Sequence, residues 1–426
     1  MSEAALAGEI SARLDELLRE RIDASQSFFA AEAEPLARLC HRMAERFSRG
    51  GTLIAFGRSP AARSDARHVA VEFVHPVIVG KRALPAIGLA GEGGDLSAQV
   101  ALIAGPDDIA IAFGTDEDGG EAAAATQLAR ARGCLTIAFS SAGAEWEPIP
   151  PSVDPYVRQE MIETLYHVLW ELVHVFFDHR GLLRGRDERR THDAGASSFL
   201  YPFLGERDNE LEPVVDDVRR SVLMKAQEIS ELRAQTLTDN REVLMAAAHG
   251  LRARFDQGGK VLALGNGGSA TDSMDAVADF RIPPRPAPPR DGHHTDATPA
   301  RSDWPPRPAL DLCEDAGILT AIANDVGTEL IFSRQVIAYG RPGDALLAMS
   351  TSGNSRNIIE ALAEARRRGL LTIAMVGYDG GRVAGDQLAD HVIVTRSENI
   401  PRIQEAQASG YHVLRELVEL VGGASP

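Results

Sequence analysis

The sequence has few cysteines and no long apolar run. Its 426 residues include three cysteines, Cys40, Cys134 and Cys313, which are far apart and lack metal-finger spacing. We therefore expect a reducing compartment rather than a disulfide framework. No run of 18 apolar residues occurs, and the N-terminus lacks a basic segment followed by an apolar one. These absences predict a soluble, cytoplasmic protein that does not enter a membrane.

The chain also lacks an excess of positive charge. It has 44 Lys and Arg against 61 Asp and Glu, for a formal net charge of -17. That balance argues against a general binder of nucleic acid or anionic membranes. A small anionic ligand remains compatible, because backbone N–H groups can hold a phosphate locally. The length suggests two domains or a little more, and the 44% hydrophobic content allows a packed core.

The chain contains an internal repeat. Residues 50–57 and 258–265 both show a Gly-Gly turn, a buried parallel strand and a glycine loop. Residues 166–173 and 411–418 share the pattern Tyr-His-Val-Leu-X-Glu-Leu-Val near the end of each half. A sequence that repeats itself in this way predicts two copies of one structural unit.

Strands alternate with helices in each half. This order predicts an α/β fold with two tandem doubly wound parallel-sheet domains, flavodoxin-like, with flanking helices. We place the first domain at residues 1–177, a polar linker at 178–212 and the second domain at 213–426. Residues 283–308 are rich in Pro, Arg and His without periodicity, which predicts an exposed insertion in the second domain.

Two loops in the second half predict a phosphate site. Residues 265–269 (Gly-Asn-Gly-Gly-Ser) and 350–355 (Ser-Thr-Ser-Gly-Asn-Ser) each follow a buried strand and open a helix. Such loops lie where doubly wound sheets bind ligands, and helix N-termini favour anions. A tight turn or ordinary helix capping is the alternative, although capping needs one hydroxyl and the second loop has four. Neither loop contains lysine, so a nucleoside triphosphate is not expected.

The second half resembles the SIS (sugar isomerase) domain over residues 220–420, most closely the phosphoheptose isomerase family. The motifs that carry this resemblance are residues 265–269, 319–325, 332–335, 340–344, 350–355, 379–381 and 402–405. The first half resembles a diverged SIS domain over residues 9–173. The resemblance implies an intramolecular oxidoreductase, an aldose–ketose isomerase that converts sedoheptulose 7-phosphate to heptose 7-phosphate through an enediol.

The resemblance also implies site residues. Those expected to bind the substrate are Asn266, Gly267, Ser269, Asn324, Asp325, Ser350, Thr351, Ser352, Ser355 and Gln404. The family binds zinc and transfers protons with a His and a Glu one helical turn apart, and a Gln and a His eight residues apart. In the second half the latter pair falls on Gln404 and His412, whereas the former falls on Asp275 and Asp279. Aspartate can ligate zinc or act as a base, but its side chain is one methylene shorter than that of glutamate.

The first half shows the opposite pattern. His68 and Glu72 fall at the family's His and Glu, and Gln159 and His167 at its Gln and His. Its serine-rich loop has become residues 114–120, whose three carboxylates would repel phosphate. The alternatives are an exposed helix pair for His68 and Glu72, and a hydrogen-bonded core histidine for His167.

Because SIS domains pair, and family sites draw on neighbouring subunits, we predict a possible composite site between the two domains. Its expected catalytic residues are Glu72, His412, Asp279 and His167. Its expected zinc ligands are His68, Glu72, Gln404 and His412, with Gln159, His167, Asp275 and Asp279 as alternatives.

Two other functions remain open on the sequence. One is a non-catalytic regulatory or assembly protein that binds a sugar phosphate. The other is a purely structural first half that completes a pseudo-dimer with the second. In each case we expect a homodimer, a pseudo-tetramer of SIS domains, whose ligand is a phosphorylated sugar.

Overall fold

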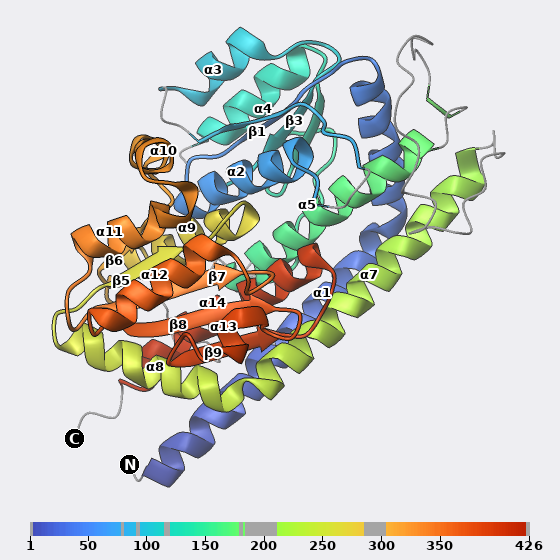
Figure 1. Ribbon diagram of the computed structural model, residues 1–426. Coiled ribbons are helices and arrows are strands. Elements are labelled where there is room, and N and C mark those ends of the chain that lie inside the picture. Colours follow the sequence, from blue (N-terminus) through green and yellow to red (C-terminus); the bar gives the residue numbers. More distant parts are fainter. Residues whose placement is uncertain are drawn as a thin grey trace. The chain divides into compact units, whose positions relative to one another are not determined.

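A computed structural model of the chain describes residues 3–77, 81–90, 94–114, 120–178, 182–183, 211–284 and 304–422. The chain divides into two compact units (Figure 1). Unit 1 comprises Met1–Ala24, Ser152–Glu160 and Ile229–Pro426, and unit 2 comprises Ser25–Pro151 and Met161–Glu228. Three long helices contribute segments to both units: α1 (Glu3–Ser48), α5 (Pro155–Asp178) and α7 (Leu211–Asp239). Most of the predicted linker and of the proline-rich insertion lies outside the described residues.

Unit 2 contains a four-stranded parallel sheet in the order β2-β1-β3-β4. Its strands are β1 (Leu53–Phe56), β2 (Ala86–Leu89), β3 (Ile109–Ala112) and β4 (Leu135–Ala138). Its shorter helices are α2 (Pro60–Val74), α3 (Leu96–Ile103) and α4 (Glu121–Ala131). The strands predicted from the Gly-Gly turn and its successors therefore form as expected.

Unit 1 contains a five-stranded parallel sheet in the order β6-β5-β7-β8-β9. Its strands are β5 (Val261–Leu264), β6 (Ala309–Asp311), β7 (Ala345–Ser350), β8 (Leu371–Gly377) and β9 (His391–Thr395). Its helices are α8 (Arg241–Asp256), α9 (Gly268–Arg281), α10 (Ala316–Asp325), η4 (Thr328–Leu330), α11 (Ile331–Tyr339), α12 (Arg356–Arg367), α13 (Gly381–Gly385) and α14 (Ile400–Leu420).

Both faces of the five-stranded sheet are covered. Along β7, Ala345, Leu347 and Met349 pack into one apolar core with α8, α9 and α14. The alternate residues Leu346 and Ala348 pack into a second core with α11 and α12. A strand buried on both faces has no polar side to alternate with, which explains its continuous apolar sequence. The predicted doubly wound fold is confirmed.

The strand order sets the position of a ligand site in unit 1. The strands follow the flavodoxin-like order, in which the direction of strand addition reverses between β5 and β7: β6 lies on one side of β5, and β7 and the later strands lie on the other. Ligands bind outside the carboxyl ends of the strands at such a reversal. The two glycine- and serine-rich loops follow these two strands. Within the described part of the chain, no helix is both long and apolar enough to cross a lipid bilayer.

Candidate functional site

The first loop predicted to bind phosphate is a close turn between β5 and α9. A Cβ on Gly265 would lie 2.1 Å from the Ser269 carbonyl oxygen, so only glycine fits at that position. Asn266 and Gly267 are exposed, and Ser269 is buried in the first turn of α9. The start of α9 thus follows two exposed residues, and a helix N-terminus is a position that favours an anion.

The second loop brings hydroxyl groups to the start of α12. Ser350 Oγ accepts from the Gly353 N–H (3.1 Å), and Ser352 Oγ accepts from the Asn354 N–H (3.2 Å). Gly353 has a φ of 61°, and a Cβ there would lie 2.3 Å from the Gly380 carbonyl oxygen. Ser355 is the N-cap residue of α12, but its side chain makes no capping hydrogen bond. Ordinary capping therefore does not account for this hydroxyl.

The remaining predicted substrate residues differ in position. The Asn266 side chain exchanges two hydrogen bonds with Asn357 on α12 (2.9 and 3.0 Å), which ties the first loop to the helix of the second. Thr351 is half-buried in the second loop. Asn324 and Asp325 are exposed at the end of α10, where the Asn324 amide donates to the Asp325 carboxylate (2.7 Å). Asn357 was not predicted from the sequence.

A buried cluster of two carboxylates and an imidazole lies on α9 and α14. Asp275 and Asp279 are one turn apart on α9, and each has a carboxylate oxygen 3.5 Å from Nε2 of His412. His412 is fully buried, and the two aspartates are 1% and 5% exposed. Tyr411 donates its hydroxyl to Asp275 (2.8 Å). The structure thus brings together three residues that the sequence placed on two separate helices.

The electrostatics of this cluster favour a positive charge at Nε2 of His412. Burial by itself lowers the pKa of His412, but the carboxylates of Asp275, Glu160 and Asp279 outweigh burial and raise the pKa to about 9. Among the described residues, His412 Nε2 and Asp275 Oδ1 are buried without a hydrogen-bond partner. A proton on His412 Nε2 would face Asp275 Oδ2 and Asp279 Oδ2, each 3.5 Å away, and a metal ion could take the place of that proton.

The donor set fits zinc. Two ligand atoms each about 2.0–2.1 Å from a tetrahedral zinc are roughly 3.3 Å apart. The corresponding separations here are 3.5 Å from His412 Nε2 to each aspartate. The Asp275, Asp279 and His412 donor atoms all lie within 4.8 Å of one another. Gln404, two turns before His412 on α14, has a buried Oε1 without a described hydrogen-bond partner, and is a candidate fourth ligand.

Glu160 is a site residue that the sequence prediction missed. It comes from the first repeat, yet its segment of α5 belongs to unit 1. Glu160 Oε1 accepts from His412 Nδ1 (2.9 Å), and Tyr156, one turn earlier, stacks on the His412 ring at 4.3 Å. The available signal was the Gln-Glu dipeptide at residues 159–160, which recurs at residues 404–405.

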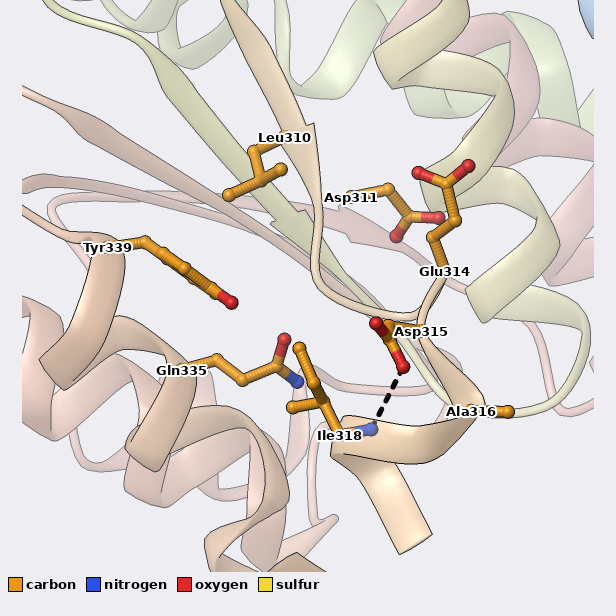
Figure 2. Close-up of a pocket in the computed structure, with 8 residues that line it drawn as sticks. All are labelled: Leu310, Asp311, Glu314, Asp315, Ala316, Ile318, Gln335 and Tyr339. Carbon is orange, nitrogen blue, oxygen red and sulfur yellow. Dashed lines mark hydrogen bonds between the residues drawn. The ribbon is translucent and has the colours of Figure 1, made fainter. Parts of the chain in front are cut away.

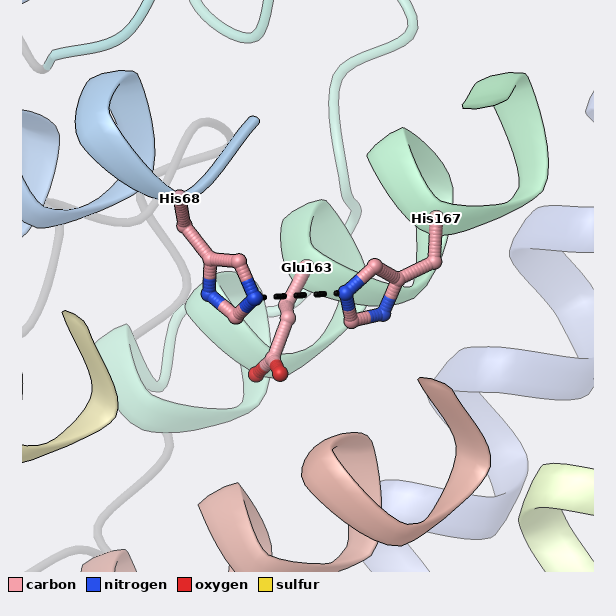
Figure 3. A group of neighbouring side chains, drawn as sticks. All are labelled: His68, Glu163 and His167. Atoms are coloured by element: carbon pink, nitrogen blue, oxygen red, sulfur yellow. Dashed lines mark hydrogen bonds between the residues drawn. The ribbon is translucent and has the colours of Figure 1, made fainter. Parts of the chain in front are cut away.

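A second buried cluster lies within unit 2. His68 on α2 and His167 on α5 meet through their Nε2 atoms at 3.4 Å, with Glu163 beside them (Figure 3). Glu72 Oε1 is 3.8 Å from His68 Nε2. Burial and the neighbouring His167 hold the pKa of His68 well below its usual value. His68 and Glu72 are 2% and 1% exposed, so the alternative of an exposed helix pair is wrong.

This second cluster also has a metal-compatible donor set, with two imidazoles and one carboxylate within 4.8 Å. Glu163 was not among the predicted ligands. Gln159, a predicted alternative ligand, is half-buried on α5 in the segment that belongs to unit 1.

A cavity of about 440 Å³ lies beside β6 (Figure 2), and its lining contains no residue of the two loops. Its lining residues are Leu310, Asp311, Glu314, Asp315, Ala316, Ile318, Gln335 and Tyr339. Asp315 accepts from the Ile318 N–H (2.9 Å) as the N-cap of α10, and burial raises the pKa of Asp311. Three acidic side chains make this cavity a poor phosphate site.

Comparisons with known proteins agree with the fold. Residues 300–377 match the family model of the SIS domain. Solved structures share the fold at low identity. The C-terminal domain of glucosamine-fructose-6-phosphate aminotransferase from Francisella tularensis has a TM-score of 0.58 at 7% identity, covering 96% of this chain and 95% of that one. Tagatose-6-phosphate ketose/aldose isomerase from Escherichia coli has a TM-score of 0.55 at 12% identity, covering 97% and 94%.

A closer sequence relative defines the family. Phosphoheptose isomerase from Chlorobium phaeobacteroides is 40% identical over 195 residues, which is 46% of this chain and 79% of that protein. The match therefore spans most of the relative but less than half of this chain, as expected for one repeat of two. By this similarity, the chain belongs to the phosphoheptose isomerase family of SIS-domain proteins.

Proposed function

We propose that the chain is a sugar-phosphate isomerase that interconverts sedoheptulose 7-phosphate and heptose 7-phosphate. The observation that carries the proposal is the buried Asp275–His412–Asp279 cluster, whose two aspartates lie on the helix that begins in the first glycine-rich loop. Asp275 lies two turns after Gly268, so the two residues are separated by roughly 10 Å along the axis of α9. That separation is comparable to the length of an open-chain heptose phosphate, whose reacting carbons are at the end remote from the phosphate.

In this proposal the phosphate binds to the two loops. Ser269, Thr351, Ser352 and Ser355 offer hydroxyls, and the N-termini of α9 and α12 offer N–H groups. Ser350 and Ser352 each accept a hydrogen bond from the loop backbone. Each hydroxyl also has an O–H group, which in this proposal donates to the phosphate. Binding through the remote phosphate orients the sugar for reaction at its other end.

The chemistry requires a proton to leave one of the two carbons that form the enediol and to return to the other. Asp279 is the candidate base, and His412, through Nε2, is the candidate proton carrier facing it. Zinc is the alternative occupant of this position: held by Asp275, Asp279, His412 and Gln404, it would replace the proton at His412 Nε2, polarise the sugar carbonyl and stabilise the enediolate oxygen. Asp275 holds its place through the hydrogen bond from Tyr411.

The first repeat supplies a second candidate set in unit 2. His68, Glu72 and His167 are buried together, and the lowered pKa of His68 keeps its imidazole neutral, the form that ligates a metal. Because these side chains are buried together, we propose Glu72 and His167 as catalytic residues. The first repeat thus contributes Glu160 to the unit 1 cluster and a separate cluster of its own.

The reaction is tested by incubating the purified full chain with sedoheptulose 7-phosphate, with and without zinc, and following the aldose by NMR. Formation of heptose 7-phosphate that depends on His412 and on Asp279 is the expected result. No aldose signal under either condition, with sugar phosphate bound, would refute the proposed activity.

The second candidate function is a sugar-phosphate-binding protein without turnover. The observation that favours it is the pair of aspartates at the family's His and Glu positions, because a base misplaced by about one ångström can lose a hundredfold in rate. We further propose a homodimer and a phosphorylated sugar as ligand. The formal charge of -17 argues against a nucleic-acid or membrane partner.

A further inference from the structure

Glu160 lies at the centre of a buried hydrogen-bond array in unit 1. Arg21 Nε donates to both Glu160 oxygens at 3.0 Å, and Arg21 Nη2 donates to Oε1 at 2.9 Å. The Ser409 hydroxyl donates to Oε2, and Arg233 donates to the Glu160 carbonyl oxygen (3.0 Å). Both partners of the Arg21–Glu160 pair have side chains that are 1% exposed.

The same carboxylate contacts the imidazole of His412. The His412 Nδ1–H donates to Glu160 Oε1 at 2.9 Å, because an ionised carboxylate can only accept. Nε2 then faces Asp275 and Asp279 at 3.5 Å. The three elements that meet here are distant in sequence: α1 supplies Arg21, α5 supplies Glu160 and α14 supplies His412.

We propose that Glu160, anchored by Arg21, is a positioning residue that fixes the His412 ring with Nδ1 protonated and Nε2 presented to a divalent cation. The inference deepens the proposed function, on which its catalytic consequence rests. A hydrogen bond from the outer nitrogen of a ligating histidine to a carboxylate selects the tautomer and orients the ring. Glu160 therefore acts through His412 and does not itself touch the substrate.

A purely stabilising role accounts less well for this arrangement. Buried ion pairs often add little stability, since desolvation offsets their attraction. A structural Arg–Glu pair also needs no third partner. Glu419, two turns after His412 on the same helix, illustrates a structural carboxylate held by arginines: it accepts from Arg307 and Arg415, and its side chain is 8% exposed. Glu160 differs because it also accepts a hydrogen bond from His412, a residue of the candidate site.

Cobalt(II) titration of the full chain tests the inference, because tetrahedral cobalt has a visible absorption band that reports its ligands. For Glu160→Gln we expect cobalt affinity to fall about 10- to 100-fold. Glu419→Gln is the matched control, because it also removes a buried carboxylate that accepts from arginine. Its cobalt affinity should stay within about twofold of wild type, which is the size of effect expected for a substitution away from the site. Thermal melting of each variant reports whether it is folded.

Arg21→Lys is the second variant in case Glu160→Gln does not fold. It keeps the charge but loses the planar fork, so we expect an intermediate loss of cobalt affinity. Equal affinity in wild type and the folded Glu160 or Arg21 variant would overturn the inference. An equal loss in Glu419→Gln, or a wild type that binds no cobalt, would also overturn it. If the wild type binds cobalt with this dependence but isomerises no sugar phosphate, the proposed function fails and the positioning role stands.

Discussion

Replacing Ser355 by alanine should weaken phosphate binding without weakening the fold. Ser355 is the N-cap residue of α12, yet its side chain makes no capping hydrogen bond, so the folded protein loses little when the hydroxyl is removed. A hydrogen bond to a charged group contributes about 1.5–3 kcal/mol. Because each 1.4 kcal/mol is tenfold in affinity, the Kd for sedoheptulose 7-phosphate should rise roughly 10- to 100-fold.

Isothermal titration calorimetry measures this Kd, with a thermal melt of the same sample. Ser59→Ala is the matched control, because Ser59 caps α2 in unit 2 and accepts from the Ala62 N–H at 3.3 Å. That variant should lose about 1 kcal/mol of stability and keep its affinity. The reasoning is refuted if Ser355→Ala binds the sugar phosphate as tightly as wild type, or if it loses as much stability as Ser59→Ala.

Four further results are expected. The double variant His68→Gln, Glu72→Gln should lower turnover measured by NMR; unchanged turnover, in an enzyme that requires Ser352, would exclude a contribution from the unit 2 cluster. Metal analysis should find bound zinc, and a chelator should abolish isomerisation while calorimetry still detects sugar-phosphate binding. Light scattering should give twice the 45.7 kDa chain mass; a monomer would contradict the homodimer. Burial would raise the pKa of Glu419, but Arg307 and Arg415 together outweigh burial and lower the pKa. The stability deficit of Glu419→Gln in urea unfolding should therefore be full at pH 7 and shrink below about pH 4.5.

Local pattern was sufficient for the fold. The apolar run of β7 and the glycine turns that precede β1 and β5 are short-range signals, and the repeat doubled each of them. Parallel strands with intervening helices leave few topologies, since crossovers are right-handed and both sheet faces must be covered. The ligand loops followed from the same argument, because their position depends only on which strand they follow.

The sequence by itself determined the two repeats, the doubly wound sheets, the positions of the two glycine- and serine-rich loops and the helical spacing of Asp275 and Asp279. Tertiary structure alone decided which nitrogen of His412 faces these aspartates, and that Glu160 and Arg21 hold the other side of the ring. It also placed Glu163 beside His68 and His167, and the Asn266 amide against Asn357. Hydrogen bonds between side chains on different helices depend on how those helices pack, and sequence spacing carries no information about such contacts beyond a single element.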